Sequence, residues 1–196
     1  VTPAHTFEDI LAQAREQRRD PARRLLLPIE NDELRVLLNQ GALPDAARDS
    51  FGETVLMQAV RRSDVARIEL LLQAGANPNA PNESGLTALH LAGDYDVVMV
   101  LLGAGADINQ PSQNGTTPLM MAVSSGKGEL VEPLLVSGAN LEYVGGQGST
   151  ALAVAVQRMD VEMVKLLLRF GASKEPARAL AQYLLRLAVV KKEIKE

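Results

Sequence analysis

The chain has 196 residues, of which 46% are hydrophobic and only 3% aromatic, and its formal net charge is −4. This charge argues against a nucleic-acid-binding protein, because such proteins usually present a basic face to phosphate. The absence of cysteine excludes disulfides, cysteine-based zinc sites and thiol nucleophiles. No apolar run approaches the roughly 18 residues of a membrane span, so we expect no membrane insertion.

The first segment, residues 1–20, is predicted to form a capping helix. Thr6 fits the N-cap position, and Glu8 and Asp9 fall in the first turn, where the helix dipole favours negative charge. We expect this helix to cover the apolar side of the segment that follows. Pro21 then breaks the helix, since proline is tolerated only at helix starts.

From residue 21 onward the chain is built of units that resemble one another. Four segments share one pattern: GETVLMQAV at 52–60, GLTALHLA at 85–92, GTTPLMMAV at 115–123 and GSTALAVAV at 148–156. Each is followed by a leucine-rich run and a Gly-Ala pair, and the leading glycines are spaced 33, 30 and 33 residues apart. A period near 33 residues predicts a stacked solenoid, because one unit cannot bury its apolar face alone.

We divide this region into a degenerate first repeat at 21–48 and four full units. The full units are 49–81, 82–111, 112–144 and 145–175. In each, a glycine-containing turn opens a first helix, and a second helix ends at the Gly-Ala pair, whose glycine fits the left-handed position after a helix. Residues 176–196 depart from the pattern and are predicted to form a C-terminal capping helix, which repeat arrays need for solubility.

The turns resemble those of ankyrin repeats, whose signature is Gly-x-Thr-Pro-Leu-His-x-Ala. All four units keep the threonine: Thr54, Thr87, Thr117 and Thr150. Pro118 alone keeps the proline, and His90 alone keeps the histidine. The resemblance covers about residues 21–175. It implies an all-α ankyrin repeat solenoid of about five helix-turn-helix units in a single domain, with capping helices at both ends. It also implies a concave face, lined by the turns and the first helices, that binds other proteins and catalyses nothing.

Two units depart from the regular pattern. The unit at 82–111 is three residues short, and alignment of its two ends places the deletion between Ala92 and Asp94. This predicts a notch in the concave face with Asp94, Tyr95 and Asp96 at its edge, unless the deletion is a neutral length change in a surface link. The second departure is Pro133, which predicts that its helix starts late or holds the proline in the first turn, with a flexible back face as the functional alternative.

The sequence offers no convincing catalytic or metal site. His90 occupies the family's histidine position, where the ring is expected to bond neighbouring turns, and it has no second ligand at helical spacing. The segment SGKGE at 125–129 lacks the first glycine and the hydroxyl residue of a phosphate-binding loop. We therefore predict no catalytic residue, no metal and no cofactor.

The candidate binding residues occupy positions that stacking does not dictate, at the turn tips and the ends of the first helices. They are Phe51, Glu53, Arg61, Arg62, Glu83, Leu86, Asp94, Tyr95, Asn114, Gln147 and Arg158. Aromatic and arginine side chains carry most of the energy at protein interfaces. Phe51 beside Arg61 and Arg62 would form an aromatic anchor with two cations, suited to a partner that carries carboxylates. The alternative is that Phe51 folds back against the preceding unit.

These features predict a non-catalytic adaptor or scaffold that acts as a monomer and binds another protein, not nucleic acid. The alternative is an inhibitor or immunity-type protein that blocks a bacterial hydrolase or toxin. The compartment stays open: cytoplasmic by default, and periplasmic or secreted if Val1 is a processed N-terminus.

Overall fold

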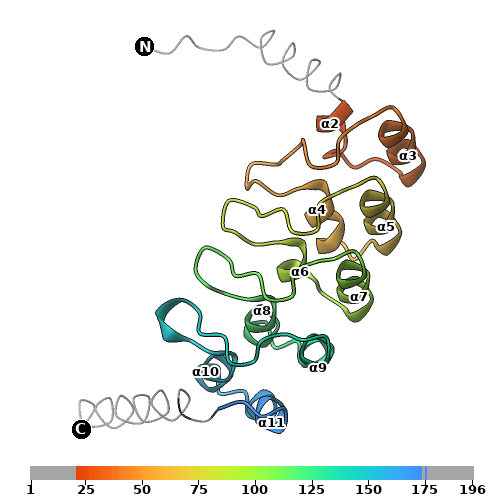
Figure 1. Cartoon of the computed structure of the whole chain (residues 1–196). Helices are drawn as coiled ribbons and strands as arrows, with labels where there is room; N and C mark the ends of the chain where they lie inside the picture. Colours follow the sequence, from red (N-terminus) through yellow and green to blue (C-terminus); the bar gives the residue numbers. More distant parts are fainter. Residues whose placement is uncertain (1–20, 174, 176–196) are drawn as a thin grey trace, which may run out of the picture.

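The computed structural model of the chain describes residues 21–173 and residue 175. The capping helices expected at 1–20 and 176–196 lie outside the described residues. Within the described part, the protein is an elongated stack of helix pairs without a β-strand (Figure 1). This confirms the stacked solenoid predicted from the repeat period and the all-α fold that the resemblance to ankyrin repeats implies.

The helices form two rows. After the single turn α2 (Pro21–Arg24), the first helices are α4 (Val55–Arg61), α6 (Ala88–Leu91), α8 (Pro118–Ser124) and α10 (Ala151–Gln157). The second helices are α3 (Asn31–Asn39), α5 (Val65–Gln73), α7 (Tyr95–Gly103), α9 (Gly128–Val136) and α11 (Val161–Arg169). Within each row, a helix packs against the next one along the stack. The first helices pack in the order α4, α6, α8 and α10, and the second helices in the order α3, α5, α7 and α9. The turns project from the side of the first helices (Figure 1).

The threonine shared by all units is the N-cap of the first helix. In three units the threonine hydroxyl accepts a hydrogen bond from the backbone N–H three residues later: Thr54 from Met57, Thr117 from Met120 and Thr150 from Ala153. In the unit at 82–111, Thr87 forms a capping box with His90. These bonds satisfy amides that a helix leaves without an intrahelical partner, which explains why the threonine recurs.

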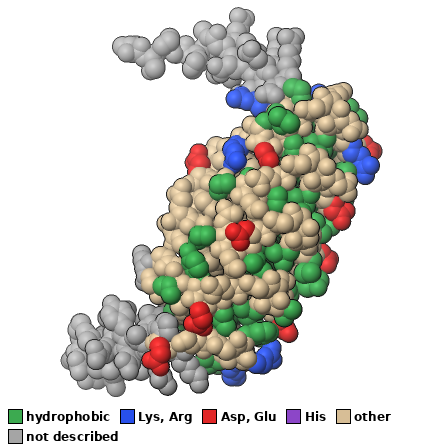
Figure 2. All heavy atoms as spheres, in the orientation of Figure 1, with side chains coloured by type: hydrophobic (Ala, Val, Ile, Leu, Met, Phe, Trp, Pro, Cys, Tyr) green, Lys and Arg blue, Asp and Glu red, His purple; other side chains and the backbone are tan. Residues whose placement is uncertain are grey.

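One apolar core runs the length of the described stack. Its centre is made of aliphatic residues that are 0% exposed: Leu34, Ile68, Leu71, Leu101 and Leu167. Burial of one such side chain contributes about 2 kcal/mol, so the interfaces between units dominate stability. Some apolar side chains also reach the surface over the row of second helices (Figure 2), among them Val36, Met99, Val136 and Val161.

The turns are tied to one another by backbone hydrogen bonds. The N–H of the later turn donates to a carbonyl of the earlier turn, from Glu83 to Phe51, from Gln113 to Ser84 and from Gly146 to Asn114, at 3.3, 3.0 and 3.1 Å. The turn glycine Gly115 has a φ of +72°, and a Cβ there would lie 2.4 Å from the Gly146 nitrogen. Glycine is thus required both for the left-handed conformation and for the close approach of the next turn.

The structure corrects the expectation for Pro133. Helix α9 begins at Gly128 and contains Pro133 in its interior, so the helix neither starts late nor holds the proline in its first turn. The helix continues past the proline, because the Ser137 N–H still donates to the Pro133 carbonyl at 3.0 Å.

Candidate functional site

The turn of the unit at 49–81 and the turn that follows it enclose a hollow of about 580 Å³, here called the N-terminal hollow. Its lining includes six of the candidate residues: Phe51, Glu53, Arg61, Arg62, Glu83 and Leu86. Phe51 is 70% exposed, so the alternative in which it folds back against the preceding unit is wrong. The turn that carries it is held in place, because Asp49 Oδ1 accepts the Phe51 N–H at 2.9 Å.

Glu53 does not face outward as expected for a turn tip. It is only 6% exposed, and its carboxylate accepts Arg61 Nε at 3.0 and 3.1 Å and Arg61 Nη2 at 2.6 Å. The hydrogen bond to Glu53 raises the pKa of Arg61 further above its usual value. The Glu53 carboxylate therefore holds the side chain of Arg61, the last residue of α4.

Asp49 orders the same turn from its other side. Burial alone would raise the pKa of the Asp49 carboxyl, but hydrogen bonds from the N–H groups of Glu53 and Phe51 and from the Gln58 amide hold it below its usual value. The carboxylate is therefore the stable form, and it accepts three hydrogen bonds, from the N–H groups of Phe51 and Glu53 and from the side-chain amide of Gln58.

The N-terminal hollow is not the doubly cationic site that the sequence suggested. Three carboxylates line it, from Asp49, Glu53 and Glu83, against two guanidinium groups. Arg61 is already paired with Glu53. The Arg62 side chain makes no hydrogen bond or ion pair to any described residue, which leaves one free cation in the lining of the hollow that also contains Phe51.

A second hollow of about 770 Å³, here called the C-terminal hollow, lies between the turns of the last two units. Its lining includes Asn114, Met120, Met121, Tyr143 and Val154, and it contains no carboxylate, ammonium or guanidinium group. Of the candidates, it holds Asn114. The backbone of Gln147 belongs to the 3-10 helix η1 (Gly146–Gly148), which forms the last turn.

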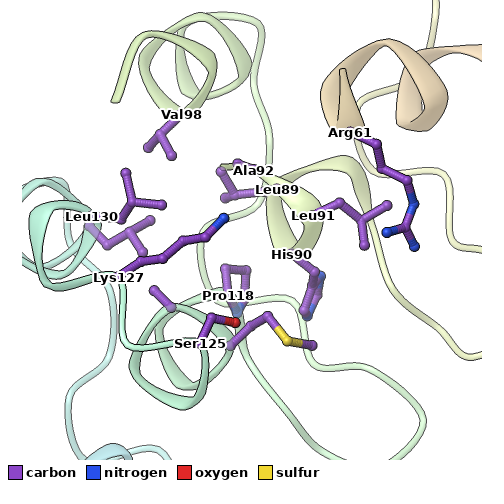
Figure 3. Close-up of a pocket in the computed structure, with 13 residues that line it drawn as sticks. Arg61, Leu89, His90, Leu91, Ala92, Val98, Pro118, Ser125, Lys127 and Leu130 are labelled. Carbon is purple, nitrogen blue, oxygen red and sulfur yellow. The ribbon is translucent and has the colours of Figure 1, made fainter. Parts of the chain in front are cut away.

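A third cavity, of about 220 Å³ and here called the notch, lies at the end of α6 (Figure 3). Helix α6 has four residues where α4, α8 and α10 have seven, so the three deleted residues come from the end of this helix. The predicted notch therefore exists, but its predicted edge is wrong. Its walls come from α6, α7, α8 and α9, with Arg61 and Lys127 at opposite sides, and they do not include Asp94, Tyr95 or Asp96.

Asp94 instead starts α7. Its Oδ1 accepts the Val97 N–H at 3.0 Å, and its Oδ2 accepts the Ser63 hydroxyl. Tyr95 lies on α7 in the row of second helices and is 52% exposed. Arg158 is exposed at the end of α10, near Gly126 of the preceding unit. These three candidates therefore do not share one site.

The three cavities adjoin one another. Arg61 lines both the N-terminal hollow and the notch, and Met121 lines both the notch and the C-terminal hollow. Together they form a track along the face made by the turns and first helices. Sequence reasoning missed Lys127, although a signal was present: the residue before each of the other regular second helices is an aspartate, Asp64, Asp94 or Asp160.

His90 has the structural role that was expected. Its Nδ1 accepts the Thr87 N–H at 3.1 Å, so its Nε2 is the protonated nitrogen and donates to the Thr116 carbonyl of the next turn at 2.9 Å. Burial lowers the pKa of the His90 imidazole, and the hydrogen bond to Thr116 offsets only part of that effect. Both ring nitrogens are occupied, which leaves neither for a metal or a substrate.

Among the described residues, no three histidine, aspartate or glutamate side chains gather in a way that could hold a metal ion. In the same part of the chain, no helix has the length and apolar character to cross a membrane.

Comparison with known proteins finds a matching family of repeats and a relative that matches over a short segment. A family model described as ankyrin repeats, three copies, matches residues 25–112 and also residues 91–177. A human protein, neurogenic locus notch homolog protein 4, is 48% identical to this chain over 56 residues. That match covers 29% of this chain and 3% of the human protein, so the chain spans a very small part of that relative.

Proposed function

The chain belongs to the ankyrin repeat family, and from this premise we propose that it binds one specific protein partner along the track formed by the two hollows and the notch. Ankyrin repeats are general protein–protein interaction modules, and the family is typically non-catalytic. We propose a role as an adaptor or scaffold, without catalysis by this chain. Stacked repeats suit this role, because they present an extended surface whose exposed residues are free to vary.

The observation that carries the proposal is the exposed Phe51 at the mouth of the N-terminal hollow. The Phe51 side chain is 70% exposed on a turn whose backbone is fixed by Asp49 and by the next turn. A rigidly held aromatic loses little conformational entropy on binding, which favours it as an interface anchor. The unpaired Arg62 and the half-buried Leu86 line the same hollow and extend the contact.

The test is an affinity pull-down with the purified chain, in which Phe51→Ala combined with Arg62→Glu is compared with the wild type. We expect the double substitution to reduce capture of the partner by tenfold or more, while circular dichroism shows unchanged helicity. Tyr95→Ala is the matched control, because it removes an exposed aromatic from the other row of helices. Loss of capture with Tyr95→Ala, and retention with the double variant, would move the site to the second helices.

The same experiment separates the two roles considered for the binder. A captured enzyme whose turnover stops when the wild-type chain is added, but not when the double variant is added, would identify an inhibitor. Captured proteins without such an effect would support the adaptor or scaffold.

A further inference from the structure

The notch occupies the place of one missing helical turn. Helix α6 is three residues shorter than its neighbours, seven minus four, which removes about 4.5 Å of helix at 1.5 Å per residue. The vacated space is the cavity of about 220 Å³, open between the ends of α4 and α8. Apolar side chains, including Leu89, Leu91 and Met121, form much of its wall.

Lys127 stands in this notch at a position where helix capping favours a different residue. It is the N-cap of α9, and it provides no side-chain hydrogen bond to that helix. Asp64 and Asp160 cap their helices with nearly the same backbone, at φ −81° and ψ 81° and at φ −84° and ψ 92°, against φ −87° and ψ 71° for Lys127. An aspartate would therefore fit, and a cation is unfavourable at a helix N-terminus. Neither capping nor backbone geometry explains the lysine.

The Lys127 side chain is directed into the notch. Figure 3 shows it extending across the cavity toward Ala92 and the end of α6. A Cβ on Gly93 would lie only 3.3 Å from the ammonium nitrogen, so glycine at this position leaves room for the charged group. Lys127 is half-buried, and its ammonium group makes no hydrogen bond or ion pair to any described residue.

No carboxylate of the described residues forms an ion pair with this ammonium group. The nearby carboxylate of Asp94 is engaged by the Ser63 hydroxyl and by the cap of α7, and it forms no ion pair with Lys127. Glu53 is occupied by Arg61, and both nitrogens of His90 are bonded within the turns. A partly desolvated cation against an apolar wall binds an incoming anion more strongly than an exposed one.

We propose that the notch receives one aspartate or glutamate side chain of the protein partner, with Lys127 as its counter-ion. This inference rests on the proposed function, because it assigns one contact within the same binding track. It places the acidic contact of the partner at the notch, not beside Phe51, where three carboxylates line the hollow.

The test uses short random peptides displayed on phage and selected on the full-length wild type, on Lys127→Met and on Lys165→Met. Lys165 is the matched control, since it is an exposed lysine paired with Glu162 on α11. We expect peptides selected on the wild type and on Lys165→Met to share one acidic position, and those selected on Lys127→Met to lack it. For a synthetic peptide from the wild-type selection, replacing that Glu by Gln should weaken binding at least tenfold to the wild type, and less than twofold to Lys127→Met.

Two further variants exclude misfolding as the cause of a loss. Lys127→Asp supplies the missing cap, so we expect it to raise the thermal midpoint by about 2 °C while it abolishes binding of the acidic peptide. An insertion of Val-Ser-Ser after Ala92 copies residues 123–125 and rebuilds the missing turn. It should remove the preference for the acidic residue by filling the notch.

The outcomes distinguish this inference from the proposed function. Peptides that compete with the partner and require Phe51, but show no acidic position or keep it on Lys127→Met, would overturn the notch assignment and leave the binding track intact. Peptides that bind regardless of Phe51, Arg62 and Lys127, or a failure to select any peptide on the wild type, would count against both.

Discussion

The neighbouring units at 82–111 and 112–144 have the same turn and differ at the end of the first helix. Both turns begin with a left-handed glycine that the next turn approaches closely, at Gly85 and Gly115, and both continue into a threonine N-cap. After that they diverge, since α6 has four residues and α8 has seven. The turn is therefore fixed by contact with its neighbours, whereas the end of the first helix is free to shorten.

His90 anchors the short helix α6 by hydrogen bonds at both of its ring nitrogens. Its ring closes the capping box on Thr87 and bonds the Thr116 carbonyl of the next turn. In the longer α8, Met120 stands at the matching position and makes no such bond. The His90 ring thus links the short helix to its own N-cap and to the next turn.

The largest expected effect concerns what the two units share. Gly115→Ala and Gly85→Ala should each cost about 3 kcal/mol, because a Cβ would add a steric clash to the strain of a left-handed residue. The Cβ would lie 2.4 Å from the Gly146 nitrogen in one case and 2.6 Å from the Gln113 nitrogen in the other. Urea unfolding measures the loss. Gly75→Ala is the control, since its φ is +87° but no atom lies within 4 Å, and it should cost about 1 kcal/mol. Equal losses at all three glycines would contradict the role of turn contacts.

A smaller effect concerns what distinguishes the short unit. Because the folded-state pKa of His90 is lowered, the unfolded chain binds a proton first as the pH falls below about 6.5. The free energy of unfolding should then decrease with falling pH, by at most about 1.4 kcal/mol per pH unit, and level off below the folded-state pKa. Urea midpoints between pH 7.5 and 5 measure this slope. His90→Gln should remove it, and His5→Gln should retain it; an unchanged slope in His90→Gln would assign it to other groups.

Much of this comparison could be predicted from the sequence. The period, the turn glycines and the threonine caps are local signals that stacking requires, and the three-residue deletion was visible from the glycine spacing. The inward turn of Glu53 toward Arg61 was not predicted, because it depends on how the chain after the turn lies along α4. The walls of the notch were missed because Lys127 reaches it from the following unit, and only the break in the aspartate pattern before the second helices pointed to it.

The most direct measurement is amide hydrogen exchange on the purified chain with and without its captured partner. If the track along the turns and first helices is the binding surface, protection should increase in the turn segments 49–53, 82–86 and 113–116 and around Gly93 and Lys127. Exchange in α5, α7 and α9 should change little. Protection confined to those second helices, with the turns unaffected, would contradict the assignment of binding to this face.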